Sequence, residues 1–144
     1  MITGFGPSEV KEAGTGHDAR FNPHYVPGAE ALDLYASIFP GFKTLAREDY
    51  GADDMGPVGT IKLATIEFNG AILQVIDSPI PHAFDLTPSM SLFVDCDSED
   101  ELTRVFATLS EGGEVMMPLD NYGFSLRFGW CKDRFGLSWQ INLP

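Results

Sequence analysis

The chain has 144 residues, of which 21 are acidic and 9 basic, so its formal net charge at pH 7 is −12. This length suits a single domain with a sizeable core, and the acidic excess, without a cluster of Lys or Arg, argues against nucleic-acid binding. No apolar run reaches the ~20 residues of a membrane span, and the Met1 end lacks a signal-peptide pattern. We therefore expect a cytoplasmic protein without membrane contact, whose cysteines, Cys96 and Cys131, are reduced thiols.

Residues 1–19 are predicted to be an N-terminal extension, because they are rich in Gly, Ser, Thr and charge and show no lasting periodicity. The segment Gly14–Ala19 formally matches G-x-G-x-x-A. A dinucleotide site needs this motif between a hydrophobic strand and a helix. Neither context is present here, so the motif does not indicate a cofactor. Residues 20–144 then form one predicted domain.

The first half of that domain, about residues 20–78, is predicted to follow the order β-α-β-β-β. Its helix has an apolar face and ends at Pro40-Gly41, and Asn69-Gly70 is a strong signal for a tight hairpin. The acidic segment Gly51–Gly59 is expected to be a loop. The predicted elements are a strand at Phe21–Val26, interrupted by Pro23, the helix Ala29–Phe39, and strands at Phe42–Tyr50, Thr60–Phe68 and Ala71–Asp77.

The second half, about residues 90–144, repeats this order after a linker at 78–89 that contains three prolines. Asp97 or Ser98 is expected to cap the helix, whose first turn is acidic, and Gly112-Gly113 ends it. The predicted elements are a strand at Ser91–Cys96, the helix Ser98–Leu109, and strands at Glu114–Pro118, Phe124–Cys131 and Leu137–Leu143.

The last strands of the two halves share a local pattern, a glycine followed four residues later by a glutamine. Gly70 precedes Gln74, and Gly136 precedes Gln140. In the final strand Leu137, Trp139 and Ile141 alternate with polar residues, which predicts one face in a core and one polar face. Together with the repeated element order, the pattern indicates a duplicated unit.

Four segments of the chain resemble the vicinal-oxygen-chelate superfamily of glyoxalase I, bleomycin-resistance proteins and extradiol dioxygenases. Within it, they are similar to the PhnB-like branch, also described as 3-demethylubiquinone-9 3-methyltransferase-like. The resemblance implies an α+β fold of two β-α-β-β-β modules, whose curled mixed sheets enclose a cavity, usually in a homodimer. An α+β barrel-like dimer of ferredoxin type is the alternative fold. The segments are Ala31–Pro40, Leu109–Gly113, Met117–Gly123 and Gly129–Gln140.

The resemblance also implies where a divalent metal would sit in catalytic relatives, held by His, Glu or Gln on the first and last strand of each module. The most widely shared of these ligands is the Glu of a D-x-x-G-x-x-x-E layout on the last strand. Here the layout starts at Asp133 but ends in Gln140, and Gln74 has the matching place in the first module. The second-module His would fall near Met90 or Ser91, and His24 is out of register. Because neutral amides are weak ligands for divalent ions, a metal is disfavoured and no cofactor is expected.

The candidate ligand-binding residues each have a structural alternative. Gln74 and Gln140 either hydrogen-bond a ligand in a cavity or pair within the protein. His24 is either a strand residue or a base, and Trp130 and Trp139 either line the cavity or pack in the core. Asp133 is expected to shape the turn before the last strand.

We expect a PhnB-like protein that binds a small, largely apolar molecule in a metal-independent cavity. Two alternatives stay open: a metal-dependent glyoxalase- or dioxygenase-type enzyme with atypical ligands, and a structural dimer without catalysis. The sequence does not decide whether there is catalysis. The methyltransferase description finds no support in the sequence, because no glycine-rich turn follows a strand in the Rossmann manner.

Overall fold

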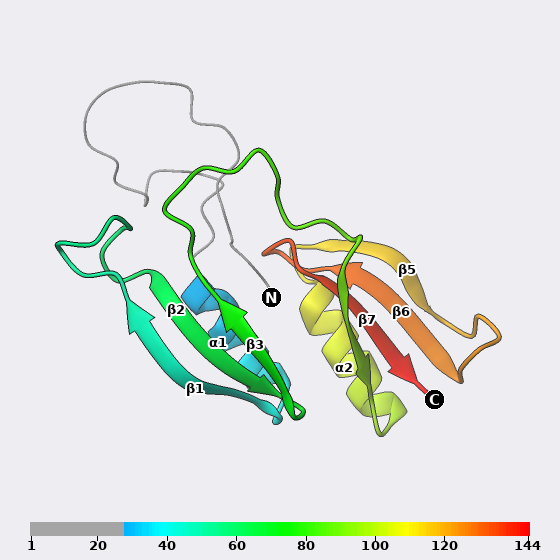
Figure 1. Ribbon diagram of the computed structural model, residues 1–144. Helices are drawn as coiled ribbons and strands as arrows, with labels where there is room; N and C mark the ends of the chain where they lie inside the picture. Colours follow the sequence, from blue (N-terminus) through cyan, green and yellow to red (C-terminus); the bar gives the residue numbers. More distant parts are fainter. Residues whose placement is uncertain (1–27) are drawn as a thin grey trace. The chain divides into compact units, whose positions relative to one another are not determined.

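The computed structural model describes residues 28–144, which fall into two compact units (Figure 1). The first unit ends at Asp85 and the second begins at Leu86, inside the proline-containing segment 78–89. The expected extension at 1–19, the expected strand Phe21–Val26 and His24 lie outside the described residues.

The first unit packs one helix on a three-stranded antiparallel sheet of order β1-β2-β3. Aromatic rings join the two layers: Phe42 and Phe68 lie 5.5 Å apart between ring centroids, and Tyr35 and Phe39 of the helix side approach them at 5.6 and 5.1 Å. These are contact distances for paired aromatic rings. The elements are α1 (Gly28–Ile38), β1 (Phe42–Asp49), β2 (Ile61–Phe68) and β3 (Ala71–Val75).

The β2–β3 connection is the two-residue hairpin that Asn69-Gly70 predicts. Both residues have positive φ, 48° and 85°, and Phe68 pairs with Ala71 directly beyond them. Two successive positive φ values give a turn whose twist matches that of the flanking strands. This connection fixes the register of β3 against β2.

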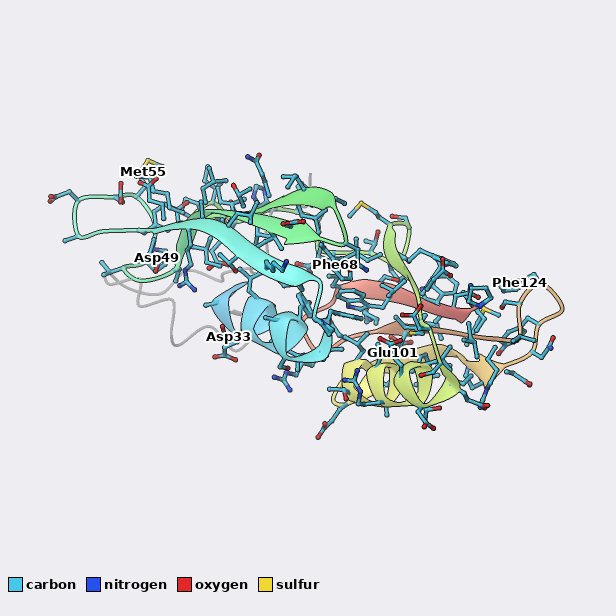
Figure 2. All side chains as sticks on the ribbon, turned by 90° about the horizontal axis from the view of Figure 1, so that it is seen from below. Asp33, Asp49, Met55, Phe68, Glu101 and Phe124 are labelled. Atoms are coloured by element: carbon cyan, nitrogen blue, oxygen red, sulfur yellow. The ribbon has the colours of Figure 1, made fainter. Side chains whose placement is uncertain are left out.

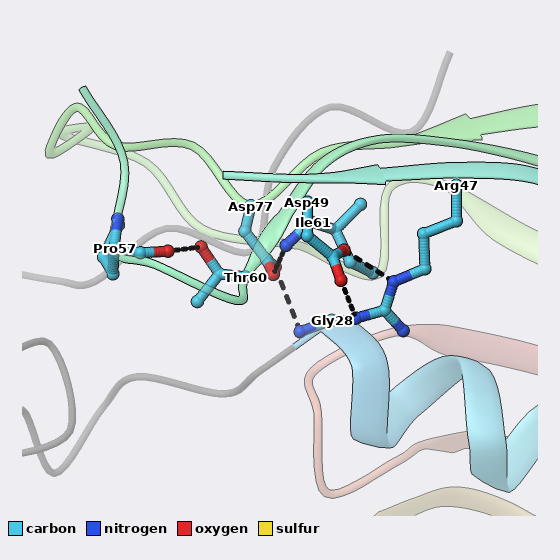
Figure 3. Close-up of polar contacts among 7 residues, drawn as sticks. All are labelled: Gly28, Arg47, Asp49, Pro57, Thr60, Ile61 and Asp77. Atoms are coloured by element: carbon cyan, nitrogen blue, oxygen red, sulfur yellow. Dashed lines mark hydrogen bonds and ion pairs between the residues drawn. The ribbon is translucent and has the colours of Figure 1, made fainter. Parts of the chain in front are cut away.

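Asp77 ties together three segments of the first unit (Figure 3). Its buried carboxylate accepts hydrogen bonds from the backbone N–H of Gly28 at 3.0 Å and from that of Ile61 at 2.8 Å. The N–H of Gly28 is one of the donors that the first turn of a helix leaves unpaired. Asp77 therefore joins the start of α1, the start of β2 and the chain after β3.

The second unit has a mixed four-stranded sheet of order β4-β7-β6-β5, in which β4 and β7 run parallel. The helix α2 covers one face of this sheet (Figure 1) with its buried residues Leu102, Val105, Phe106 and Leu109. Ser98 caps α2 by accepting from the N–H of Glu101. The elements are β4 (Ser91–Asp95), α2 (Glu99–Ser110), β5 (Glu114–Asp120), β6 (Arg127–Lys132) and β7 (Ser138–Leu143).

Asp133 shapes the turn between β6 and β7, as the sequence predicts. Its Oδ1 accepts from the N–H groups of Phe135 and Leu137 at 2.9 and 3.0 Å, and its Oδ2 accepts from the indole Nε1 of Trp139 at 2.8 Å. Gly136 adopts the positive φ, 89°, that such a tight return requires. One buried carboxylate thus fixes both the turn and the first core residue of β7.

The expected α+β fold with two small sheets and two helices is confirmed, and several details differ, among them strand β3, which ends at Val75 instead of Asp77. The sheets are open instead of curled, because three or four strands are too few to close on themselves. Strand β5 continues through Pro118 to Asp120, which an edge strand tolerates because its outer side needs no N–H donor. Strand β6 begins at Arg127 instead of Phe124, and the ring of Phe124 packs against that of Phe128.

The expected enclosed cavity stays a prediction, and so does the cellular compartment. In the part of the chain that the structure describes, no helix is long and apolar enough to cross a membrane.

Replacing Asp77 with Asn should make stability depend less on pH. Burial raises the pKa of Asp77, so its contribution to the free energy of unfolding is full below the unfolded pKa, about 4, and is lost as pH rises through the folded pKa. The stability difference between wild type and Asp77→Asn should therefore shrink from pH 4 to pH 7 in urea denaturation. A difference that grows would contradict this, and Asp53→Asn, in an exposed loop, is the control.

Replacing Asp133 with Asn should destabilise the protein by roughly 1–3 kcal/mol, because an amide cannot accept from both backbone groups and the indole without placing a donor against a donor. Denaturant unfolding followed by tryptophan fluorescence measures this. Glu111→Gln, which removes the same charge at an exposed position of the second unit, should change little. A variant within about 0.5 kcal/mol of wild type would show that the turn does not depend on Asp133.

Candidate functional site

The two faces of the second unit's sheet differ in what covers them. Gly129 of β6 faces α2, since a Cβ at this position would collide with the ring of Phe106. Its register partner Ile141 lies on the same face. Side chains alternate along each strand, so the residues between these positions point away from α2. We call that side the open face; its residues on β4, β6 and β7 are Ser91, Phe93, Asp95, Phe128, Trp130, Lys132, Ser138, Gln140 and Asn142.

Gln140 lies in the middle of the open face. It is half-buried and sits in register between Phe93 on β4 and Trp130 on β6. Gln74 of the first unit is exposed and pairs with Thr65, while its neighbour Val75 pairs with the buried Ala64. Each glutamine therefore lies on the helix-free face of its own sheet, in the last strand of a hairpin. The repeated glycine-glutamine pattern marks equivalent positions in the two units.

The two tryptophans lie on opposite faces. Trp130 is on the open face, and its indole N–H donates to Ser138 Oγ at 2.8 Å. That hydroxyl is also 2.7 Å from Ser91 Oγ, which holds the ring in one orientation. Trp139 is fully buried on the α2 side and donates to Asp133. Trp139 is thus a core residue, and only Trp130 is placed to meet a ligand on the open face.

Four aromatic rings gather at one end of the open face, and we call them the aromatic cluster. Phe128 is at its centre, with ring centroids 5.1 Å from Phe124, 6.1 Å from Tyr122 and 6.4 Å from Phe93. Figure 2 shows Phe124 on the loop between β5 and β6. Phe93 is 54% exposed and Phe124 63% exposed, so the cluster offers apolar surface to a ligand. These residues are not among those predicted from the sequence, although aromatic residues gather within Tyr122–Phe128.

Asn142 lies beside the aromatic cluster and is only 8% exposed. Its Nδ2 donates to Asp95 Oδ1 at 2.7 Å. Its own Oδ1 is buried and has no hydrogen-bond partner among the residues that the structure describes. A buried acceptor without a donor costs about 1–3 kcal/mol. Alternation placed Asn142 on the polar face of the last strand, but its link to Asp95, 47 residues earlier, is visible only in the structure.

The titratable groups of residues 28–144 are not arranged as a metal centre, and neither cysteine is activated as a nucleophile. Within residues 28–144, no group of three or more His, Cys, Asp or Glu side chains is arranged to hold a metal ion. Burial raises the pKa of Cys96 and of Cys131 to about 11, so both stay protonated at neutral pH. His82 contacts Ser78 Oγ at 2.7 Å and stacks on Phe84, which ties it to the segment after β3.

Comparisons with known proteins agree with this architecture. The family model for 3-demethylubiquinone-9 3-methyltransferase matches residues 25–142. The PhnB protein of Bacillus cereus is 39% identical, with a TM-score of 0.77, over 81% of this chain and 91% of its own. Protein PA1353 of Pseudomonas aeruginosa is 30% identical, with a TM-score of 0.64, over 79% and 86%.

A glyoxalase-related enzyme from Fulvimarina pelagi is 18% identical, with a TM-score of 0.57, over 83% of this chain and 82% of its own, and shares the fold alone. Comparison with curated proteins gives no match. The matched span and the identity to the Bacillus cereus protein show that the chain belongs to the PhnB-like 3-demethylubiquinone-9 3-methyltransferase family.

Proposed function

We propose that this protein binds a small, largely apolar molecule on the open face of the second unit, without a metal ion. The observation behind the proposal is the aromatic cluster, whose exposed rings lie next to the amides of Gln140 and Asn142. Ligand sites typically combine an apolar lining with a few polar groups that fix orientation. The α2 face has no such mixture, because α2 fills it with apolar side chains.

A metal-independent site fits the donors on this face. Gln140, Asn142 and the two serines offer neutral oxygens, and the carboxylates in register with this face are Asp95, Asp120 and Glu114. Glu114 is already paired with Lys132. Divalent ions are held by several carboxylates or imidazoles. A metal-dependent glyoxalase- or dioxygenase-type enzyme with atypical ligands is therefore the second candidate, and a structural dimer without catalysis is the third.

Methyl transfer is not part of the proposal, despite the family's description. Strand β4 leads into α2 through Cys96, Asp97 and Ser98, without the glycine-rich turn that lets a backbone approach a nucleotide cofactor. The parallel β4–β7 pair lies in a small mixed sheet instead of a doubly wound one. We assign binding to this fold and leave its reaction unassigned.

Nile red, a neutral apolar dye, should bind the protein and brighten on binding. Phe93→Ala should weaken this binding about tenfold, equivalent to about 1.4 kcal/mol. The reason is that about half of the Phe93 ring is exposed to the dye, and the variant loses that apolar contact. Fluorescence titration gives both affinities. Met55→Ala, an exposed apolar side chain in the 51–59 loop of the first unit, should leave the affinity unchanged.

The same titration tests metal independence, since prior treatment with EDTA should not change the dye's affinity. If chelation abolishes dye binding and Zn²⁺, Ni²⁺ or Fe²⁺ restores it, the result favours the second candidate, the metal-dependent enzyme. Equal affinity of Phe93→Ala and wild type for the dye would show that the dye does not bind at the open face, and would contradict the proposal.

We also propose that the protein is a homodimer. The helix-free face of the first unit exposes Leu63 and Ile72, the latter to 59%, and monomeric proteins seldom leave such side chains together on a sheet. Light scattering at micromolar concentration should give twice the mass of the chain, and Ile72→Lys should lower it toward that of one chain. Lys43→Ala, on the same face, is the matched control. A wild-type monomer would contradict the proposal.

A further inference from the structure

We infer that the ligand of the open face is a small organic cation, an apolar or aromatic body that ends in a protonated amine. The inference rests on the proposed function and adds the chemical class of the ligand. Its N–H would donate to Asn142 Oδ1, its charge would lie near Asp95, and its apolar body would contact the aromatic cluster.

The orientation of the Asn142 amide follows from its partner. The atom that faces Asp95 Oδ1 at 2.7 Å must be the NH₂ group, because a carboxylate accepts hydrogen bonds and does not donate them. The other amide atom is therefore the oxygen. This oxygen is buried, and within the described residues it has no donor. A ligand that supplies an N–H or O–H group would satisfy it, and a ligand that has only acceptors would not.

The position of Asn142 selects for an apolar body next to that donor. Asn142 lies in register between Asp95 on β4 and Phe128 on β6. Phe128 is the centre of the aromatic cluster. The faces of aromatic rings attract cations, so a protonated amine gains from rings as well as from a carboxylate.

The charges around this end of the sheet favour a cation over an anion. Asp95 and Asp120 are both exposed. Asp95 pairs in register with Asn142, and Asp120 pairs in register with Phe128. Arg127 is turned toward α2, where it pairs with Glu99, and Lys132 pairs with Glu114 at the other end of β6. The basic groups of β6 are thus engaged, and an anionic ligand would meet two carboxylates.

The experiment compares three probes of similar shape on the full-length protein by calorimetric titration: 2-phenylethylamine, 2-phenylethanol and 3-phenylpropanoate. The amine should bind at least about tenfold more tightly than the acid, with the alcohol between them, because the amine supplies both donor and charge. Its advantage over the alcohol should decrease in high salt, which screens the charge of Asp95. Equal affinities for amine and acid would overturn the inference.

Two variants separate the donor from the charge. Asp95→Asn keeps an acceptor for Asn142 Nδ2 but removes the charge, so amine binding should weaken several-fold while alcohol binding is unchanged. Glu111→Gln, an equal charge change away from the open face, should alter neither. Asn142→Leu should weaken both donor probes about tenfold.

Unchanged amine binding by Asn142→Leu would mean that a water satisfies Oδ1, and would overturn the inference. If Asn142→Leu does not fold, the ratio of amine to alcohol affinity in Asp95→Asn decides. The Nile red titration separates the two proposals: if wild type binds the dye but shows no preference for the amine, only this inference fails. If wild type does not bind the dye, the proposed function fails as well.

Discussion

The buried carboxylate of Asp133 is the constraint on which the second unit depends. It closes the turn through Phe135 and Leu137 and holds the indole of Trp139 in the core. Side chains alternate along a strand, so a slip of one residue in β7 would exchange its two faces. Gln140 and Asn142 would then lie under α2, and Trp139 would leave the core. The chemistry of the open face therefore follows from a turn that is not part of it.

The first unit uses a buried aspartate for a different purpose. Asp77 comes after its last strand and bonds the backbone at the start of α1 and of β2, whereas Asp133 comes before the last strand of its unit. The register of β3 is set instead by the Asn69-Gly70 hairpin. In the described residues, both units thus have a helix followed by three strands, with a glutamine in the last strand, but they fix their last strands by different local chemistry.

The open face differs from an ordinary solvated sheet face because its polar groups are organised. Ser138 holds Trp130 in one orientation and Asp95 holds Asn142 in another, while Asn142 Oδ1 is left without a donor among the described residues. Buried polar atoms are nearly always paired in folded proteins. This exception, beside exposed aromatic rings, is the observation from which the proposed binding site is argued.

The sequence by itself determined the element order from α1 to β7, the Asn69-Gly70 hairpin, the role of Asp133 and the family, because each depends on residues close together in the chain. The first strand and His24 lie outside the described residues. Only the tertiary structure decided that Trp130 and Trp139 lie on opposite faces, that Phe93 joins Phe128, and that Asn142 meets Asp95. The contacts of Phe93 and Asp95 join β4 to strands that are distant in sequence, and strand pairing, which local pattern does not specify, brings them together. The two tryptophans are separated by the register of β6 against β7.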